Sequence, residues 1–369
     1  MGLKIYSSIL YFYNGVAEPI EKAFAEIPSN SVCGVVLCGT SDTIEYHLLL
    51  SEIKSAIYAS IGKKVPVTLI PQQLLPSEGF ALEIYALDGE ANFQIKEQGG
   101  VCYGIVENDN EKMLFVEGVP AMDFSDKVCA QSQEVFAKLD TLLSAYGFEV
   151  SDIVRQWNYI GNIVSYKDGK QNYQEFNDAR SAYYAKSEWH NGYPAATGIG
   201  STDGIIVGGI AFKKSNGTGI YPIDNPLQVA AHIYSKSVLI DNDANAIKST
   251  PKFERAKLIE TDSGVYCFVS GTAAIRGEES VDPSSAKLQT IKTIENIEYL
   301  VSKENLVRFG CKPYELKYAF LHIFIKHAED YEAVKSVVEE RCPQVATIYS
   351  VADVCRSELL VEIEGILTL

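Results

Sequence analysis

The feature that most constrains this chain of 369 residues is an internal repeat. Residues 115–121 (FVEGVPA) are echoed by residues 268–274 (FVSGTAA). Each segment follows a strand-like run and precedes an amphipathic helix, a strand, a second helix and two closing strands. A chain that repeats such a series is expected to build two similar modules.

This order of elements predicts an α+β fold in which each module is a mixed sheet with two helices on one face. We expect the first module, with an N-terminal extension, over residues 1–215 and the second over residues 216–369. In the extension, short apolar runs predict strands, and two stretches predict helices: Ala17–Glu26 and Leu50–Ile61. We find no chemical motif in the first 90 residues.

The closing strands of the two modules align when Gly209 is placed on Gly365. In this alignment the two glutamates of the second module fall on residues without a carboxylate in the first: Glu362 on Ile206, and Glu364 on Gly208.

Alternation along residues 360–365 puts Leu360, Glu362 and Glu364 on one face of the closing strand. Two carboxylates on one face mark either a solvated surface or the floor of a polar pocket. A solvated face has no reason to become Ile and Gly in the sister module. The alignment therefore favours a pocket in the second module and a non-catalytic first module.

The composition of the chain argues against several classes of partner and site. A net charge of −16 argues against nucleic acid and membrane surfaces as partners. Eight Cys without a CxxC spacing indicate neither a disulfide scaffold nor a zinc site. No run reaches the roughly 18 apolar residues of a membrane span, and no signal peptide is evident, so a cytoplasmic protein is expected. We expect no metal or organic cofactor.

Each copy resembles a module of the Rid (YjgF) superfamily, through residues 269–271, 293–297 and 361–365. Within that superfamily the chain resembles a two-module chorismatase over roughly residues 100–369. The segments that carry this resemblance are RQWNYI (155–160), FNDAR (176–180), PAAT (194–197), NPLQVAA (225–231), SGTAAI (270–275) and CRSELLVEIE (355–364). The resemblance implies hydrolysis of chorismate to pyruvate and a C7 ring acid. An acidic small molecule is then the expected partner.

Rid deaminases resemble one another in an Arg that grips the substrate carboxylate. The matching positions here are Thr347 and Ala196, so deamination of the Rid type is disfavoured. Two alternatives stay open: a Rid-like enzyme acting on another enol or imine, and a non-catalytic protein that binds a small acid.

Cleavage of chorismate begins with protonation of its enolpyruvyl methylene carbon, which requires a carboxylic acid that is protonated near neutral pH. An apolar strand environment raises the pKa of a Glu, so Glu362, between Val361 and Ile363, is the candidate general acid. It also matches the acid of the family. Cys355 matches a family position associated with 3-hydroxybenzoate as the product rather than a dihydrodiol acid. The alternative interpretation of Cys355 is a small buried hydrophobe.

The two carboxylates of chorismate require cationic donors, preferably Arg. Arg155 lies on one strand face with Trp157 and Tyr159, and Arg180 lies on the following helix; an ion pair or core packing is the alternative for each. The further candidates share a place near the repeat motif or the acid: Gly271 and Thr272, whose N–H groups could hold an anion, Arg276, and Glu364.

The chain departs from the family pattern at Ile233, where an Arg is expected, and at Arg276 and Glu278, where Gly and His are expected after the SGTA segment. Arg276 could supply the missing charge from a different backbone position. Rid modules usually form trimers, and a fused pair satisfies part of that interface, so the sequence leaves monomer and homotrimer open.

Overall fold

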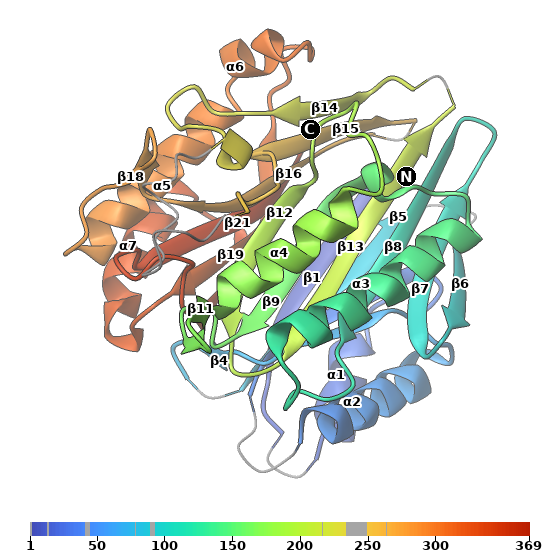
Figure 1. Ribbon diagram of the computed structural model, residues 1–369. Coiled ribbons are helices and arrows are strands. Elements are labelled where there is room, and N and C mark those ends of the chain that lie inside the picture. The colour runs from blue at the N-terminus through green and yellow to red at the C-terminus, as the bar shows by residue number, and fades with distance from the viewer. Residues whose placement is uncertain are drawn as a thin grey trace.

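The computed structural model describes residues 2–12, 15–40, 45–77, 79–88, 93–215, 217–233, 249–262 and 264–369. Three larger mixed sheets follow one another along the chain, and helices cover them (Figure 1). No helix in these ranges is both long and apolar enough to cross a bilayer.

The first of these sheets belongs to an N-terminal unit, residues 2–88. Its strands lie in the order β1-β5-β2-β3. Its elements are β1 (Gly2–Leu10), α1 (Ala17–Phe24), β2 (Val32–Gly39), α2 (Tyr46–Ile61), β3 (Val67–Ile70), β4 (Gln73–Leu74) and β5 (Phe80–Asp88). The predicted helices and strands of this region are confirmed, with ends displaced by up to four residues.

The first copy of the repeat, residues 93–214, forms a sheet in the order β12-β9-β13-β8-β7-β6. Its elements are β6 (Phe93–Gln98), β7 (Val101–Glu107), β8 (Glu111–Pro120), α3 (Val128–Ala145), β9 (Ile153–Gly161), β10 (Tyr166–Lys167), β11 (Lys170–Gln171), α4 (Asn172–Tyr184), β12 (Ala195–Ser201) and β13 (Ile205–Lys214). Helices α3 and α4 lie side by side on one face of this sheet, as predicted (Figure 1).

The second copy, residues 220–368, repeats this order as β20-β19-β21-β16-β15-β14, and β4 of the N-terminal unit extends it beyond β20. Its strands are β14 (Ile220–Ile223), β15 (Ala256–Thr261), β16 (Gly264–Ala273), β17 (Ile275–Arg276), β18 (Glu279–Ser280), β19 (Lys317–Ile325), β20 (Ala346–Val351) and β21 (Val361–Thr368). Its helices are α5 (Ala286–Leu300), α6 (Lys303–Arg308) and α7 (Tyr331–Arg341). The α+β class and the repeat are therefore confirmed.

The strand registers confirm the alignment of the two closing strands. Gly209 of β13 pairs with Val116, and Gly365 of β21 pairs with Val269, which is the matching residue of the repeat motif. In both copies the register then shifts by a bulge, after Val116 in β8 and after Val269 in β16. A bulge re-aims the side chains that follow it, so the same local distortion is built into both copies.

Leu360 departs from the predicted alternation. It precedes β21 and packs against the same apolar cluster as Val361 and Ile363, on the side opposite Glu362. Because Leu360 lies outside the regular strand, the two-residue period does not apply to it. The two glutamates do share the other face, and each is 5% exposed. The solvated-face interpretation is thereby excluded.

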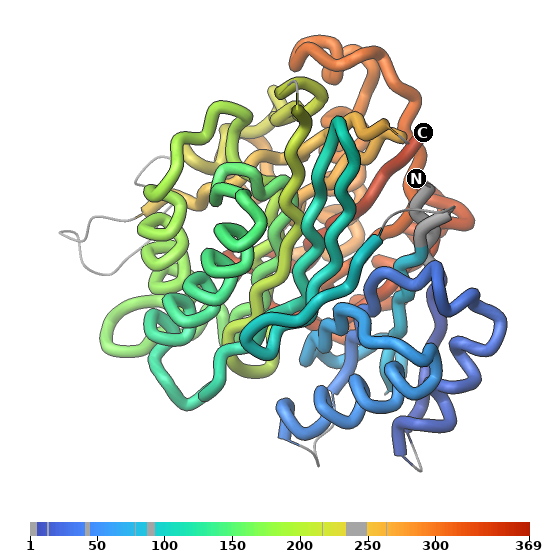
Figure 2. Tube along the Cα trace, turned by 90° about the vertical axis from the view of Figure 1, so that its right-hand side faces the viewer, coloured from blue at the N-terminus to red at the C-terminus, as the bar shows by residue number. Residues whose placement is uncertain are grey.

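The N-terminal unit is more than an extension. Its order β1-β5-β2-β3 repeats β8-β13-β9-β12 of the first copy, with the same parallel and antiparallel pairings. It is therefore a third, shorter copy, which has no counterpart of the hairpin strands β6 and β7 among the described residues. Figure 2 shows it (blue) beside the first (green) and second (orange to red) copies.

Candidate active site

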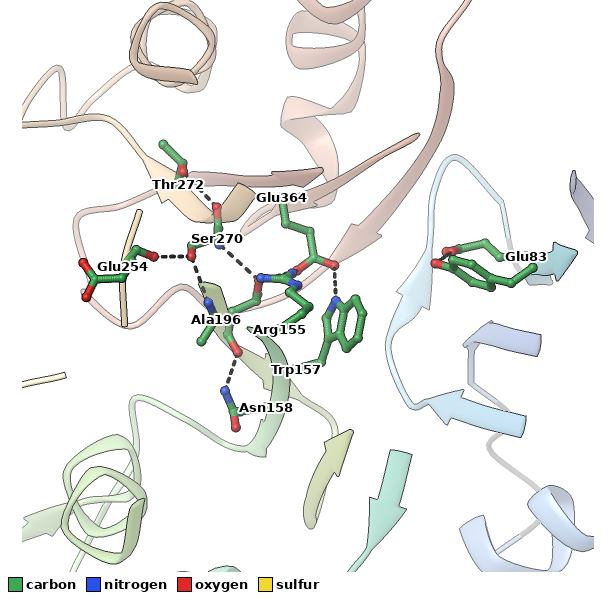
Figure 3. Close-up of polar contacts among 12 residues, drawn as sticks. Glu83, Arg155, Trp157, Asn158, Ala196, Glu254, Ser270, Thr272 and Glu364 are labelled. Atoms are coloured by element: carbon green, nitrogen blue, oxygen red, sulfur yellow. Dashed lines mark hydrogen bonds and ion pairs between the residues drawn. The ribbon is translucent and has the colours of Figure 1, made fainter. Parts of the chain in front are cut away.

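The site lies at a seam where the edge strand β12 of the first copy meets β16 of the second; we call it the second seam. The Ala196 N–H donates to Ser270 Oγ (2.8 Å), and the Gly271 N–H donates to Thr197 Oγ1 (3.1 Å). These bonds satisfy backbone donors at the sheet edge and at the bulge of β16. Figure 3 shows the Ser270 end of this seam.

The bulge of β16 brings Gly271 directly over Glu362. A Cβ atom at position 271 would overlap Glu362 Oε1, so only glycine leaves room for this carboxyl. The Gly271 N–H donates to Thr197 and is not free to hold an anion, which differs from the prediction; what approaches the Cα of Gly271 is the candidate acid.

A pocket of about 700 Å³ opens at this seam, within the size range of small-molecule sites. Four of the predicted residues line it: Glu362, Cys355, Arg180 and Gly271. Other groups that line it are Tyr173 of α4, Arg255 before β15, and Arg356 and Glu358 after β20.

The Glu362 carboxyl is held in its neutral form by its surroundings. Burial first and the charge of the neighbouring Glu364 second raise its pKa from 4.5 to about 8, against the opposing effects of Arg255 and Arg155. Desolvation disfavours the charged form of a carboxyl. At pH 7 this side chain therefore carries a proton and faces a pocket that can admit a ligand.

Cationic groups form the walls of the pocket. Arg180 is 1% exposed; its Nη2 donates to Asn177 Oδ1 (2.6 Å), and its Nε has no hydrogen-bond partner among the described residues. Arg255 donates to the Val229 carbonyl (3.0 Å) and Arg356 to the Glu278 carbonyl (2.9 Å). The neutral amide of Asn177 leaves the charge of Arg180 available to an anion.

Cys355 and Tyr173 lie on the same pocket as neutral groups. Burial raises the pKa of the Cys355 thiol to about 12, with Glu362 as the next cause. Burial also raises the pKa of the Tyr173 hydroxyl. A thiol in this state is a weak hydrogen-bond donor rather than a nucleophile.

Three predicted site residues line a different space. Arg155, Tyr159 and Glu364 surround a central cavity of about 40 Å³ that all three copies line. The one-face prediction for the β9 residues is confirmed, since Trp157 lines the same cavity. Their placement contradicts a substrate contact in the pocket, because alternate residues of an interior strand point to the core between the sheets.

Two further predicted contacts also lie outside the pocket lining. Thr272 is 1% exposed, and its hydroxyl donates to the Ser270 carbonyl (2.8 Å), which fixes the bulge. Arg276 forms an ion pair with Glu295 on α5 (3.2 Å) and does not replace the missing Arg. Ile233, where that Arg was expected, is 65% exposed.

Arg255 and Arg356 were missed. Arg356 directly follows Cys355 in the segment 355–364, which carries part of the family resemblance. Its position next to a candidate site residue could have identified it. Arg255 lies outside the repeat motif and outside the segments that carry the family resemblance, so no sequence pattern pointed to it. Among the described residues, no group of three His, Cys, Asp or Glu side chains is placed to hold a metal ion.

The chain is similar to known proteins in sequence and in fold. A sequence profile described as "Chorismatase FkbO/Hyg5-like, N-terminal" matches residues 88–211. A 3-hydroxybenzoate synthase from Streptomyces hygroscopicus is 30% identical over 320 residues, which are 84% of this chain and 87% of that protein. A chorismatase from Streptomyces rapamycinicus is 30% identical over 83% of this chain and 88% of that protein.

A crystal structure of a chorismatase matches the whole fold, with a TM-score of 0.72 at 21% identity over 100% of this chain and 99% of that one. A smaller YjgF-family protein from Mycobacterium tuberculosis covers 38% of this chain with a TM-score of 0.25. The fold is that of a chorismatase-like α+β protein. The chain belongs to the chorismatase family.

Proposed function

We propose that this protein cleaves chorismate to pyruvate and a C7 ring acid, with 3-hydroxybenzoate as the product, and that Glu362 is the general acid. The family relatives named above support the substrate. The observation that carries the role of Glu362 is its buried, neutral carboxyl on the wall of an arginine-rich pocket.

In this reaction the Glu362 carboxyl transfers its proton to the methylene carbon of the enolpyruvyl group. A new C–H bond forms, and the adjacent carbon becomes an oxocarbenium-like cation. The neighbouring ring hydroxyl captures this cation, and the proton of that hydroxyl passes to the oxygen that becomes the phenol. Collapse then releases pyruvate and leaves an aromatic ring. The ring proton that is lost on aromatisation returns to the Glu362 carboxylate, so no net water is consumed and the acid is regenerated.

The pocket arginines hold the two carboxylates of the substrate. Arg180 and Arg255 line the pocket from the first and second copies, and Arg356 lines it from the loop after β20. A guanidinium binds a carboxylate through two parallel hydrogen bonds, which fixes orientation as well as charge. We assign one carboxylate to Arg180 and Arg255 and the other to Arg356.

Cys355 supports the choice of product. Its neutral thiol lies on the Glu362 side of the pocket, where it excludes water from the cation that forms there. With water excluded, the ring hydroxyl is the remaining nucleophile. The relative named 3-hydroxybenzoate synthase supports the same outcome.

The test is an incubation of the purified protein with chorismate, followed by assays for pyruvate and for the ring acids. We expect equal amounts of pyruvate and 3-hydroxybenzoate. Glu362→Gln is expected to abolish both without unfolding the protein. Glu83→Gln is the matched control, because Glu83 is also a buried acid whose pKa burial raises to about 8, but it does not line the pocket. No pyruvate at high enzyme concentration would reject the proposal, and stabilisation by chorismate without turnover would leave a binding protein.

The organisation of the chain follows from the same proposal. Residues 216–369 carry the acid, and residues 1–215 supply the opposite wall and no acid of their own. The three copies in one chain form between themselves the contacts that separate modules otherwise form, so we propose a monomer. Light scattering at micromolar concentration tests this, and a mass three times that of the chain would reject it.

A further inference from the structure

Glu364 contacts three donors and lies two residues from Glu362 on the same face of β21. The Arg155 Nη2 donates to its Oε2 (2.5 Å), and the Trp157 Nε1 donates to its Oε1 (3.2 Å) (Figure 3). The third donor is the hydroxyl of Thr197. All four side chains lie in the interior or at the central cavity, and Arg155 and Glu364 are 1% and 5% exposed.

The polarity of these hydrogen bonds fixes the protonation state of Glu364. Thr197 Oγ1 accepts from Arg155 Nη2 (2.8 Å) and from the Gly271 N–H (3.1 Å), and neither of these groups can accept. The Thr197 proton must therefore point to Glu364. The indole N–H and the guanidinium also only donate. With donors on both oxygens, Glu364 is an ionised carboxylate.

Glu362 presents the opposite case on the same strand face. No described residue forms a hydrogen bond with its carboxyl, which lies against the Cα of Gly271 and the open pocket. Arg155 already neutralises Glu364 through a hydrogen-bonded ion pair, whereas a negative charge on Glu362 would be buried without a hydrogen-bonded partner among the described residues. The pair is therefore stable with one proton, and the hydrogen bonds assign that proton to Glu362.

We propose that Glu364 is a positioning residue that acts through Glu362: held ionised by Arg155, Thr197 and Trp157, it keeps the neighbouring carboxyl protonated and ready to donate. This inference rests on the proposed role of Glu362 as the general acid. It explains why a residue outside the pocket lining belongs to the site, and it gives the interior ion pair a function beyond stability.

The other charged and titratable groups around Glu362 act in both directions. Arg255 and Arg155 favour its ionised form and lower its pKa, whereas burial and the Glu364 charge raise it. The remaining titratable groups that line the pocket with it are Tyr166, Tyr173, Arg180, Glu279, Cys355, Arg356 and Glu358. Glu364 is the negative charge that raises the pKa of Glu362, so its removal has a defined sign.

The test is the pH profile of kcat/KM for chorismate in Glu364→Gln. The wild-type rate should fall as pH rises through about 8, because Glu362 then loses its proton. In Glu364→Gln this fall should move to lower pH by about one unit or more, since a like charge is lost and Arg155 is left unpaired. Activity near that of the wild type should return at acidic pH, which a purely structural defect would not allow.

Two controls sharpen the test. Glu364→Asp keeps the charge and should keep the fall near pH 8. Glu83→Gln removes the other buried acid with a pKa of about 8 and should leave the profile unchanged, which shows that the fall does not report Glu83. If Glu364→Gln does not fold, Trp157→Phe removes one donor to Glu364 and should shift the profile in the same direction by less.

An active Glu364→Gln variant with an unshifted profile would overturn the inference. A wild-type protein that does not turn over chorismate would instead reject the proposed function. In that event carbon-13 NMR of labelled glutamate still tests the coupling, since the Glu362 carboxyl should titrate at lower pH in Glu364→Gln than in the wild type. Identical titration in both proteins would reject it.

Discussion

Two seams of this molecule share one backbone construction and differ in the side chain beneath the glycine and in the residue that precedes the glycine. At the second seam, the Gly271 N–H donates to Thr197 Oγ1 (3.1 Å), and Glu362 lies beneath the glycine. At the first seam, between the N-terminal unit and the first copy, the Gly118 N–H donates to Thr68 Oγ1 (2.7 Å). Ile206 lies beneath that glycine, where a Cβ would come within 3.0 Å of its Cγ2.

The surroundings of the two seams have diverged accordingly. Where the second seam has Ser270, the first has Glu117, which accepts from the Val67 N–H (2.8 Å) and pairs with Lys54 (2.7 Å). The first seam is thus joined by a partly buried ion pair and an apolar side chain. The backbone arrangement is therefore common to both seams and is structural. The second seam differs in having a neutral acid and arginines around a pocket, which are the features of a candidate active site.

The largest effect should come from making the second seam resemble the first. Glu362→Ile places the residue of the sister position under Gly271 and should lower kcat for chorismate cleavage by at least about 10³-fold, since general acids contribute effects of this size. The measurement is pyruvate release at saturating chorismate, with circular dichroism as the control for folding. A Glu362→Ile variant whose kcat is within tenfold of the wild-type kcat would show that Glu362 is not what distinguishes the second seam from the first.

The stability of Glu362→Gln should move in the opposite direction from its activity. Between pH 4.5 and about 8 the unfolded chain releases a proton that folded Glu362 retains, so the wild type loses stability as pH rises through that window. The loss is about 1.4 kcal/mol per pH unit, or up to about 3 kcal/mol at pH 7. Glu362→Gln should recover this amount at pH 7 in urea unfolding and none of it below pH 4.5.

The control for that measurement is Glu329→Gln, an exposed acid on the surface, which should change the free energy of unfolding by less than about 0.5 kcal/mol. Equal stability of Glu362→Gln and the wild type at every pH would show that Glu362 is ionised in the folded protein.

Adding a methyl group at Gly271 or at Gly118 should have different effects on activity, because only the seam of Gly271 carries the candidate active site. In Gly271→Ala the new Cβ displaces the Glu362 carboxyl, and a displacement of this kind should lower kcat by about 10²-fold. In Gly118→Ala the new Cβ meets Thr68 and Ile206 and should reduce stability while the activity of the folded fraction is retained. Equal losses of kcat in both variants would contradict the assignment of the site to one seam.

The smallest effect concerns the arginines. Arg180→Lys keeps the charge but loses the two-pronged geometry, so KM for chorismate should rise by about tenfold with little change in kcat. Arg276→Lys, whose side chain pairs with Glu295 outside the pocket lining, should leave KM unchanged. A larger effect at Arg276 than at Arg180 would restore the role that the sequence suggested for Arg276.

The repeat explains how much of this could be predicted from the sequence. A shared FV-x-G motif and the closing Gly aligned the two copies, and the pairing of Gly209 with Val116 and of Gly365 with Val269 confirms that alignment. The N-terminal unit has neither motif, so its likeness to the other copies appears only in the order and pairing of its strands.

The candidate site was predicted less completely, for a geometric reason. Alternation places a side chain on one face of a strand but does not say which space that face meets. Arg155, Tyr159 and Glu364 were assigned to the correct faces and then to the wrong cavity. Arg255 enters the pocket from a segment without periodicity, so no local pattern pointed to it.

The central claim is that Glu362 carries a proton at neutral pH in the folded protein. Difference infrared spectroscopy between the wild type and Glu362→Gln measures this directly, through the C=O band of a protonated carboxylic acid. If burial keeps Glu362 protonated, the band is present at pH 7 and disappears with a midpoint near pH 8. A band that is lost near pH 4.5, the ordinary range for Glu, would contradict it.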